Sequence, residues 1–202
     1  MNLPNRLTMA RVAVIPIFIV LIRLDTFWGY CLSLAAFVGA ALTDYYDGKI
    51  ARRRNSVTNF GKLLDPVADK VLIAAAFISF LDKEYVGIPS WVVIVIVGRE
   101  LLVTGFRSIA ASSGVVIGAE KWGKLKTVSQ MICAITILAL ISGREAISRF
   151  FESASDEFLP LYDQGMRLTT VVMVTITMLV TVVSALILFQ EHRRFLVSPG
   201  AN

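Results

Sequence analysis

The sequence is poor in charged residues and in the side chains that build disulfide and metal frameworks. Of its 202 residues, 17% are Asp, Glu, Lys or Arg, against about 25% in soluble domains, whereas 56% are hydrophobic. Its two cysteines, Cys31 and Cys133, both lie inside apolar runs, and its one histidine, His192, follows the last of these runs. The sequence therefore excludes a disulfide-rich secreted domain and argues against zinc. We expect the cysteines to be packing residues and His192 to be solvated.

The hydrophobic residues are gathered in runs of roughly 17 to 25, the length with which an α-helix crosses a bilayer. The chain is therefore predicted to be an all-α, polytopic membrane protein that forms a single domain over residues 1–202. An amphipathic segment, residues 1–11, is expected to form a short N-terminal interfacial helix without a signal-peptide cleavage site. Six transmembrane spans are predicted, at about 10–24, 27–46, 63–81, 88–110, 127–141 and 168–189.

Lysine and arginine are distributed unequally between the connections of these spans. The segments on the side of the N-terminus are the more basic ones, namely 1–9, 48–62, 111–126 and 191–202. On the other side, the long connection 143–166 is acidic. The positive-inside rule therefore places both termini in the cytoplasm. The net charge of +5 fits this topology and anionic phosphate chemistry, and it does not indicate nucleic-acid binding.

Four aspartates flank the cytoplasmic connection between the second and third predicted spans. Asp44 and Asp47 end one apolar run at a spacing of i,i+3, and Asp65 and Asp69 begin the next at i,i+4. Each pair therefore projects from one face of its helix. The predicted orientation places both pairs at the same depth in the membrane. Two helices joined at this point can bring four carboxylates together.

Four carboxylates in facing pairs repel one another, which raises their pKa values unless a cation neutralises them. Ligands that are all oxygen favour a hard ion, Mg²⁺ or Mn²⁺, over zinc. Arginine beside such a site indicates an anionic substrate, most simply a phosphate or diphosphate. The alternative is a set of interfacial acids that are solvated or paired with the arginines at 52–54, which the paired spacing makes the less favoured interpretation.

Eight positions of this stretch stand at fixed spacing: Asp44-x-x-Asp47-Gly48-x-x-Ala51-Arg52, eight residues, then Gly61-x-x-x-Asp65-x-x-x-Asp69. This pattern resembles the signature of the CDP-alcohol phosphotransferases, integral membrane enzymes that displace CMP from a CDP-linked lipid or alcohol. Residues 4–11 are similar to the N-terminal segment of that family. Residues 98–127 are similar to its bacterial phosphatidylglycerophosphate synthase branch. The resemblance covers most of residues 1–140.

The resemblance implies a set of roles for the signature residues. One or two divalent ions would be bound by Asp44, Asp47, Asp65 and Asp69, of which Asp69 would also be the catalytic general base. The CDP-lipid would be bound by Asn5, Thr8, Gly48, Arg52 and Thr58. The resemblance also implies a homodimer in the bacterial inner membrane, among membrane lipids, with its active site facing the cytoplasm.

The reaction implied by the resemblance is transfer of a phosphatidyl group from CDP-diacylglycerol to glycerol 3-phosphate, with release of CMP. No Ser, Cys or His stands out as a nucleophile, so direct transfer is the simpler mechanism.

Four basic residues downstream form a second candidate site. Arg99 and Arg107 interrupt a predicted span, which costs a few kcal/mol per charge at mid-membrane unless each charge is satisfied. Their spacing puts them roughly on one helix face. With Lys124 and Lys126, at the start of the next span, they are expected to bind the phosphate of a soluble acceptor. The alternatives are an ion pair with Glu100 and simple anchoring of the two lysines at the cytoplasmic surface.

Two alternative functions remain open. Within the family, the acceptor could instead be inositol phosphate, serine or phosphatidylglycerol, because residues 98–127 indicate glycerol 3-phosphate by resemblance alone. An ion-coupled transporter would also carry acids within the membrane. Transporter sites, however, tend to lie at the midplane between inverted repeats. These acids are predicted at the cytoplasmic edge of a chain with no evident repeat.

Overall fold

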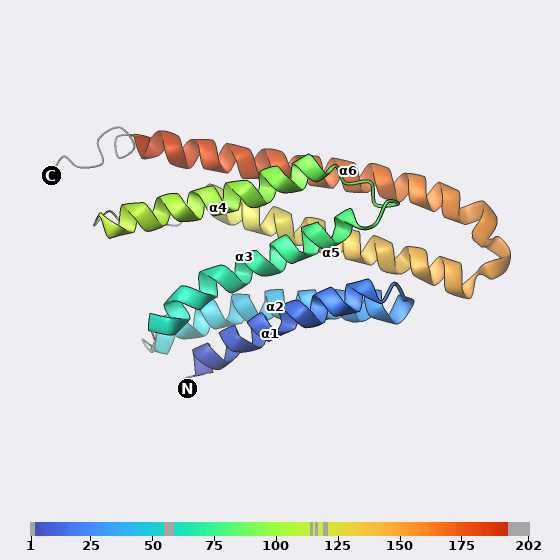
Figure 1. Ribbon diagram of the computed structural model, residues 1–202, viewed down its shortest axis with the longest axis horizontal. Helices are drawn as coiled ribbons and strands as arrows, with labels where there is room; N and C mark the ends of the chain where they lie inside the picture. Colours follow the sequence, from blue (N-terminus) through green and yellow to red (C-terminus); the bar gives the residue numbers. More distant parts are fainter. Residues whose placement is uncertain (1–2, 55–58, 114, 116, 119–120, 194–202) are drawn as a thin grey trace.

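The computed structural model describes residues 3–54, 59–113, 115, 117–118 and 121–193, and for 3–8, 11, 44–54, 59–69, 121 and 152–157 it describes the backbone alone. The described residues form helices and no strand, which confirms the all-α prediction. The helices are α1 (Leu3–Arg23), α2 (Phe27–Arg54), α3 (Asn59–Leu81), α4 (Ser90–Ser112), α5 (Lys121–Phe150) and α6 (Glu152–Glu191) (Figure 1).

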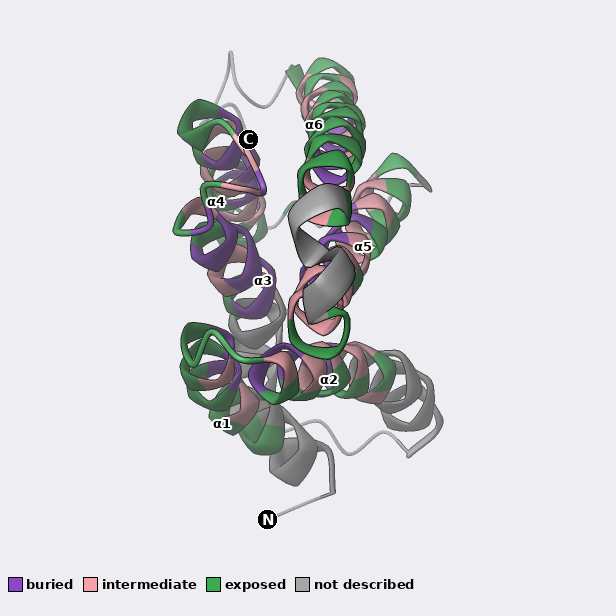
Figure 2. Cartoon of the chain, turned by 90° about the vertical axis from the view of Figure 1, so that its right-hand side faces the viewer, coloured by how far each residue is buried: buried purple, intermediate pink, exposed green. Residues whose placement is uncertain are grey.

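The helices run back and forth along one axis, and the start of α1 and the end of α6 lie at the same end of the bundle (Figure 1). α1 packs against α2 and α3, α5 packs against α6 and α2, and α4 packs against α6 and α3. Seen along the bundle, α3 and α4 stand on one side and α5 and α6 on the other (Figure 2). The buried core includes four phenylalanines on α1, α2 and α3, namely Phe18, Phe37, Phe77 and Phe80.

The outside of the bundle is strongly apolar, while several polar side chains are buried inside it. Large aliphatic residues such as Ile94, Leu102 and Leu168 are about two-thirds exposed, and serine and threonine are among the buried residues. Two described segments, Trp122–Phe150 and Phe158–Glu191, are long and apolar enough to cross a membrane. The apolar parts described in α1, α2 and α3 are shorter, so the count of six spans stays a prediction.

The prediction of a short, separate interfacial helix at the N-terminus is wrong. Residues Leu3–Arg23 form one continuous helix, so the amphipathic beginning runs directly into the first apolar run. Pro4 lies in the first turn, where its missing N–H costs no intrahelical hydrogen bond. From there to Pro16 the sequence contains no glycine or proline that would favour a break.

The prediction of a long connection over residues 143–166 is also wrong. α5 continues to Phe150 and α6 begins at Glu152, so a single residue separates the two helices. At about 1.5 Å per residue α6 is roughly 60 Å long, and its hairpin with α5 projects past the other two connections at that end (Figure 1). Arg144 and Asp163 join the two helices through hydrogen bonds of 2.7 and 3.0 Å.

A polar network links all three helix connections at this end. The Tyr30 hydroxyl donates to the Asp25 carboxylate at 2.5 Å and lies 3.1 Å from the Tyr85 hydroxyl. Lys83, whose side chain is buried, pairs with the same carboxylate, and the Arg144 guanidinium stacks 4.3 Å from the centre of the Tyr85 ring. These contacts fix the helices at the end of the bundle opposite the start of α1 and the end of α6.

Candidate functional site

The four aspartates of the signature lie on the backbone of α2 and α3. Asp44 and Asp47 fall in the second half of α2, and Asp65 and Asp69 fall in the first half of α3. Continuous helix through both pairs preserves the i,i+3 and i,i+4 spacing, and the end of α2 and the start of α3 lie at the same end of the bundle (Figure 1). The four side chains lie outside the described residues, so their convergence on a metal ion stays a prediction.

The residues predicted to bind the CDP-lipid also lie outside the residues whose side chains are described. Asn5 and Thr8 are on the backbone of α1, and Gly48 and Arg52 are on that of α2. Thr58 belongs to the segment between α2 and α3, which the structure does not describe. Their role in binding the donor therefore stays a prediction.

A cavity of about 520 Å³ lies between α3, α4, α5 and α6, with Ala41 of α2 also in its lining. All four basic residues predicted to bind an acceptor phosphate line it, namely Arg99, Arg107, Lys124 and Lys126. A fifth cation, Lys70, lines the same cavity and follows Asp69 directly in the sequence. The structure therefore brings the second candidate site together and places it beside the helix that carries Asp65 and Asp69.

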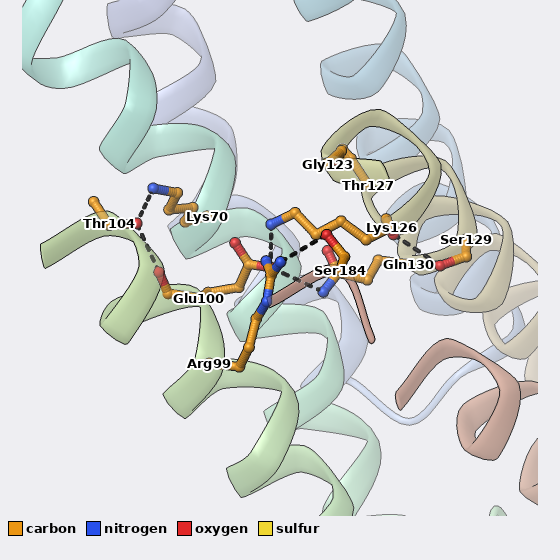
Figure 3. Close-up of polar contacts among 10 residues, drawn as sticks. All are labelled: Lys70, Arg99, Glu100, Thr104, Gly123, Lys126, Thr127, Ser129, Gln130 and Ser184. Carbon is orange, nitrogen blue, oxygen red and sulfur yellow. Dashed lines mark hydrogen bonds and ion pairs between the residues drawn. The ribbon is translucent and has the colours of Figure 1, made fainter. Parts of the chain in front are cut away.

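Inside the cavity one carboxylate, Glu100, organises two of these cations. Glu100 Oε1 accepts a hydrogen bond from Arg99 Nη1 at 3.1 Å, pairs with Lys126 Nζ, and lies 3.4 Å from Gln130 Nε2 (Figure 3). Arg99 also donates from Nη2 to Ser184 Oγ on α6, at 2.9 Å. These contacts join α4, α5 and α6 through charged side chains that are almost completely buried.

Arg107 and Lys124 are held much less firmly than Arg99 and Lys126. Arg107 is half-buried and donates from Nη2 to the Gly118 carbonyl at 3.3 Å. Lys124 is exposed, and no described residue forms an ion pair or a hydrogen bond with it. These two cations remain available to a ligand.

Two guanidinium nitrogens in the cavity are buried without a hydrogen-bond partner among the described residues, Arg99 Nε and Arg107 Nε. Buried polar groups in proteins nearly always have partners, and an exception calls for a specific explanation such as a missing ligand. Among the described residues of its lining five are basic and one is acidic, and the cavity volume lies within the range of about 300 to 1,000 Å³ of small-molecule sites. This arrangement suits a small, multiply charged anion.

The structure distinguishes between the alternative roles of these basic residues. The ion pair with Glu100 is present for Arg99, whereas the contact described for Arg107 is with a carbonyl group. Lys126 points inward to Glu100 and is not a surface anchor. Sequence reasoning missed Lys70, although its position after Asp69 was a signal, and it missed Gln130, which stands one helical turn after Lys126. For Ser184, on α6, the sequence offered no signal.

The CDP-alcohol phosphatidyltransferase family model matches residues 1–189 of the chain. The chain belongs to the CDP-alcohol phosphatidyltransferase family. This confirms the resemblance drawn from the signature, and the match extends through α6, beyond the part that sequence reasoning covered.

Within this CDP-alcohol phosphatidyltransferase family, three similar proteins carry the name CDP-diacylglycerol–glycerol-3-phosphate 3-phosphatidyltransferase. The protein of Bacillus subtilis (strain 168) is 42% identical over 68% of this chain and 76% of its own length. That of Rickettsia typhi is 44% identical over 69% of this chain and 76% of its own length. That of Pseudomonas fluorescens is 39% identical over 69% of this chain and 73% of its own length.

Proposed function

We propose that this protein transfers the phosphatidyl group of CDP-diacylglycerol to glycerol 3-phosphate, forming phosphatidylglycerophosphate and CMP. One observation carries the proposal: the basic residues predicted for the acceptor phosphate line a single cavity, and Lys70 joins that cavity to the helix of Asp65 and Asp69. The relatives support the same donor and acceptor, because both are part of their shared name.

In the proposed reaction Asp69 acts as the general base. It takes the proton of the primary hydroxyl of glycerol 3-phosphate while that oxygen attacks the phosphorus bound to diacylglycerol. The bond from this phosphorus to the oxygen of CMP breaks, and CMP leaves with the electron pair. We take transfer to be direct, the simpler mechanism, because no cysteine or histidine is among the described residues that line the cavity.

The signature aspartates suit a hard divalent ion. Four carboxylates on successive turns of α2 and α3 offer only oxygen ligands, which fits Mg²⁺ or Mn²⁺. The candidate ligands are Asp44, Asp47, Asp65 and Asp69. One or two bound ions would neutralise charge on the diphosphate and on the departing CMP.

The four acceptor residues divide into two pairs in this proposal. Arg107 and Lys124 bind the phosphate directly, because nothing else described in the protein occupies their charged groups fully. Arg99 and Lys126 line the base of the cavity, where Glu100 holds them in place. They add positive potential to the cavity.

We place the protein in the bacterial inner membrane with the chain termini and the cavity on the cytoplasmic side. The apolar outer surface and the two helices long enough to span a bilayer support insertion. The orientation rests on the distribution of lysine and arginine. In this orientation the donor lipid enters from the bilayer and the soluble acceptor from the cytoplasm. The family resemblance also predicts a homodimer.

Release of CMP tests the proposed function. The full-length protein in detergent is supplied with CDP-diacylglycerol, Mg²⁺ and one acceptor at a time, from glycerol 3-phosphate, inositol phosphate, serine and phosphatidylglycerol. We expect CMP release with glycerol 3-phosphate, and loss of it with EDTA. Asp69→Asn should abolish release, whereas the matched variant Asp82→Asn, an acid at the opposite end of the bundle, should keep it. Release with another acceptor and none with glycerol 3-phosphate would contradict the proposal.

A further inference from the structure

The Glu100 carboxylate uses its two oxygens differently. All three of its hydrogen-bonding partners, on Arg99, Lys126 and Gln130, are bonded to Oε1. No described residue donates to Oε2, and Oε2 is not among the side-chain atoms that are sealed from solvent without a partner. Figure 3 shows the second oxygen directed toward the side of the cavity where Lys70 lies. One carboxylate oxygen is therefore fixed and the other is open to the cavity.

The open oxygen is chemically unusual within this cavity. The other charged side chains in its described lining are lysines and arginines, which donate hydrogen bonds and attract the phosphate. An ionised carboxylate can only accept, and it repels the phosphate oxygens. A carboxylate oxygen left open here therefore matches a ligand group that donates a hydrogen bond, and in a small phosphorylated alcohol the only such groups are hydroxyls.

Glycerol 3-phosphate carries two hydroxyls, and the proposed reaction uses only one of them. The primary hydroxyl must face Asp69, which takes its proton. The secondary hydroxyl remains as a donor in the same molecule, between the attacking oxygen and the phosphate. Lys70 stands beside Asp69 in sequence, and its ammonium group donates to Thr104 Oγ1, close to the Glu100 backbone (Figure 3). The cavity thus runs from Lys70, which follows Asp69 in the sequence, toward Glu100.

We propose that Glu100 determines acceptor specificity, accepting through Oε2 a hydrogen bond from the secondary hydroxyl of glycerol 3-phosphate while Oε1 holds Arg99 and Lys126. This inference rests on the proposed function, because it takes the acceptor and the place of attack from it. Glu100 would then contact the substrate as well as serving as the buried counter-ion of Arg99 and Lys126. The site then recognises a phosphorylated diol, and a phosphate beside a single alcohol satisfies it less well.

Propane-1,3-diol monophosphate provides the direct test, since it keeps the phosphate and the attacking hydroxyl and lacks only the secondary hydroxyl. We compare kcat/KM for this analogue and for glycerol 3-phosphate by CMP release. A hydrogen bond to a charged group predicts that the wild type prefers glycerol 3-phosphate by roughly 10- to 100-fold. Glu100→Gln, which replaces the charged acceptor with a neutral one, should reduce this preference by about tenfold.

Ser184→Ala is the matched control, because it removes the Arg99 hydrogen bond in the same network and leaves Glu100 intact. It should lower kcat/KM for both acceptors by the same factor. If Glu100 only supports the cations, Glu100→Gln will also lower both equally, and the inference fails while the proposed function stands. If the wild type prefers glycerol 3-phosphate over the analogue by less than about threefold, the inference about Glu100 is overturned, even where Glu100→Gln does not fold. If the wild type releases CMP with neither acceptor, the proposed function fails and this inference fails with it.

Discussion

The same substitution in two arginines on one face of α4 should affect protein stability at one position and acceptor binding at the other. Arg99 and Arg107 line one cavity, and replacing either with methionine removes one positive charge at nearly constant volume. Arg99 donates to both Glu100 and Ser184, and its side chain is 8% exposed. Arg107 is half-buried, and its described hydrogen bond is a long one to the Gly118 carbonyl. We expect Arg99→Met to reduce stability and Arg107→Met to reduce acceptor binding.

The structure sets the size of each effect. Removing one partner of a buried ion pair costs about 3–5 kcal/mol when the other partner is left alone. Lys126 and Gln130 still contact Glu100 after Arg99→Met, so we expect a loss of about 2–3 kcal/mol in the free energy of unfolding. For Arg107→Met the lost contact is a charge-assisted hydrogen bond to phosphate, worth about 1.5–3 kcal/mol, or roughly a 10- to 100-fold rise in KM. Its effect on stability should stay within about 0.5 kcal/mol.

Both quantities can be measured on the same purified protein. KM for glycerol 3-phosphate is obtained from CMP release at saturating CDP-diacylglycerol, and stability from unfolding in mixed detergent micelles followed by circular dichroism. Arg107→Lys is the conservative control, and it should recover part of the lost KM because it restores the charge without the planar guanidinium. An unchanged KM in Arg107→Met, or a larger loss of stability there than in Arg99→Met, would refute the division of roles.

Two further predictions concern the end of the bundle away from the cavity. A Cβ at Gly143 would lie 2.6 Å from the Tyr162 hydroxyl, so Gly143→Ala should lower the free energy of unfolding by about 1–2 kcal/mol. Gly98→Ala, where a Cβ meets open space, should not; equal effects would contradict the packing seen here. Burial raises the pKa of Asp25, but hydrogen bonds from Lys83 and a tyrosine outweigh it and hold the pKa below its ordinary value of 3.8. A lowered carboxyl pKa stabilises the fold above the unfolded-state value and loses that contribution as pH falls through the folded-state value. The unfolding midpoint should therefore fall with acidification below about pH 4, by a small amount because the Asp25 side chain is 61% exposed. An Asp25→Asn variant with the same acid dependence as the wild type would rule this group out as the cause.

The helical architecture could be predicted from the sequence because apolar runs of membrane-spanning length leave few other structures. The start of α2 and the ends of α3 and α4 fall within two residues of expectation. Polar helix ends were harder to predict. Because it lies between two apolar runs, the segment 143–166 is predicted to be a connection, yet it is helical, and Arg144 and Asp163 pair across α5 and α6 and satisfy part of its charge.

The basic residues of the candidate site could be predicted from the sequence. Which of them are held by Glu100 and which are open to a ligand could not. Arg99 and Arg107 stand on one face of a helix, which spacing alone reveals. Glu100 holds Arg99 and leaves Arg107 open because of the way α5 and α6 pack against α4. The contacts involved join residues up to 85 positions apart. No local pattern contains such contacts, and for this reason Ser184 could not have been found from the sequence.

Transfer of label from glycerol 3-phosphate to lipid shows whether the protein catalyses the proposed reaction. The purified wild type is incubated with CDP-diacylglycerol, Mg²⁺ and glycerol 3-phosphate labelled in its glycerol carbon, and the lipid phase is extracted. We expect a labelled phospholipid formed in one-to-one ratio with CMP, and no labelled lipid from Asp69→Asn. Release of CMP without label in the lipid, or full transfer by Asp69→Asn, would contradict it.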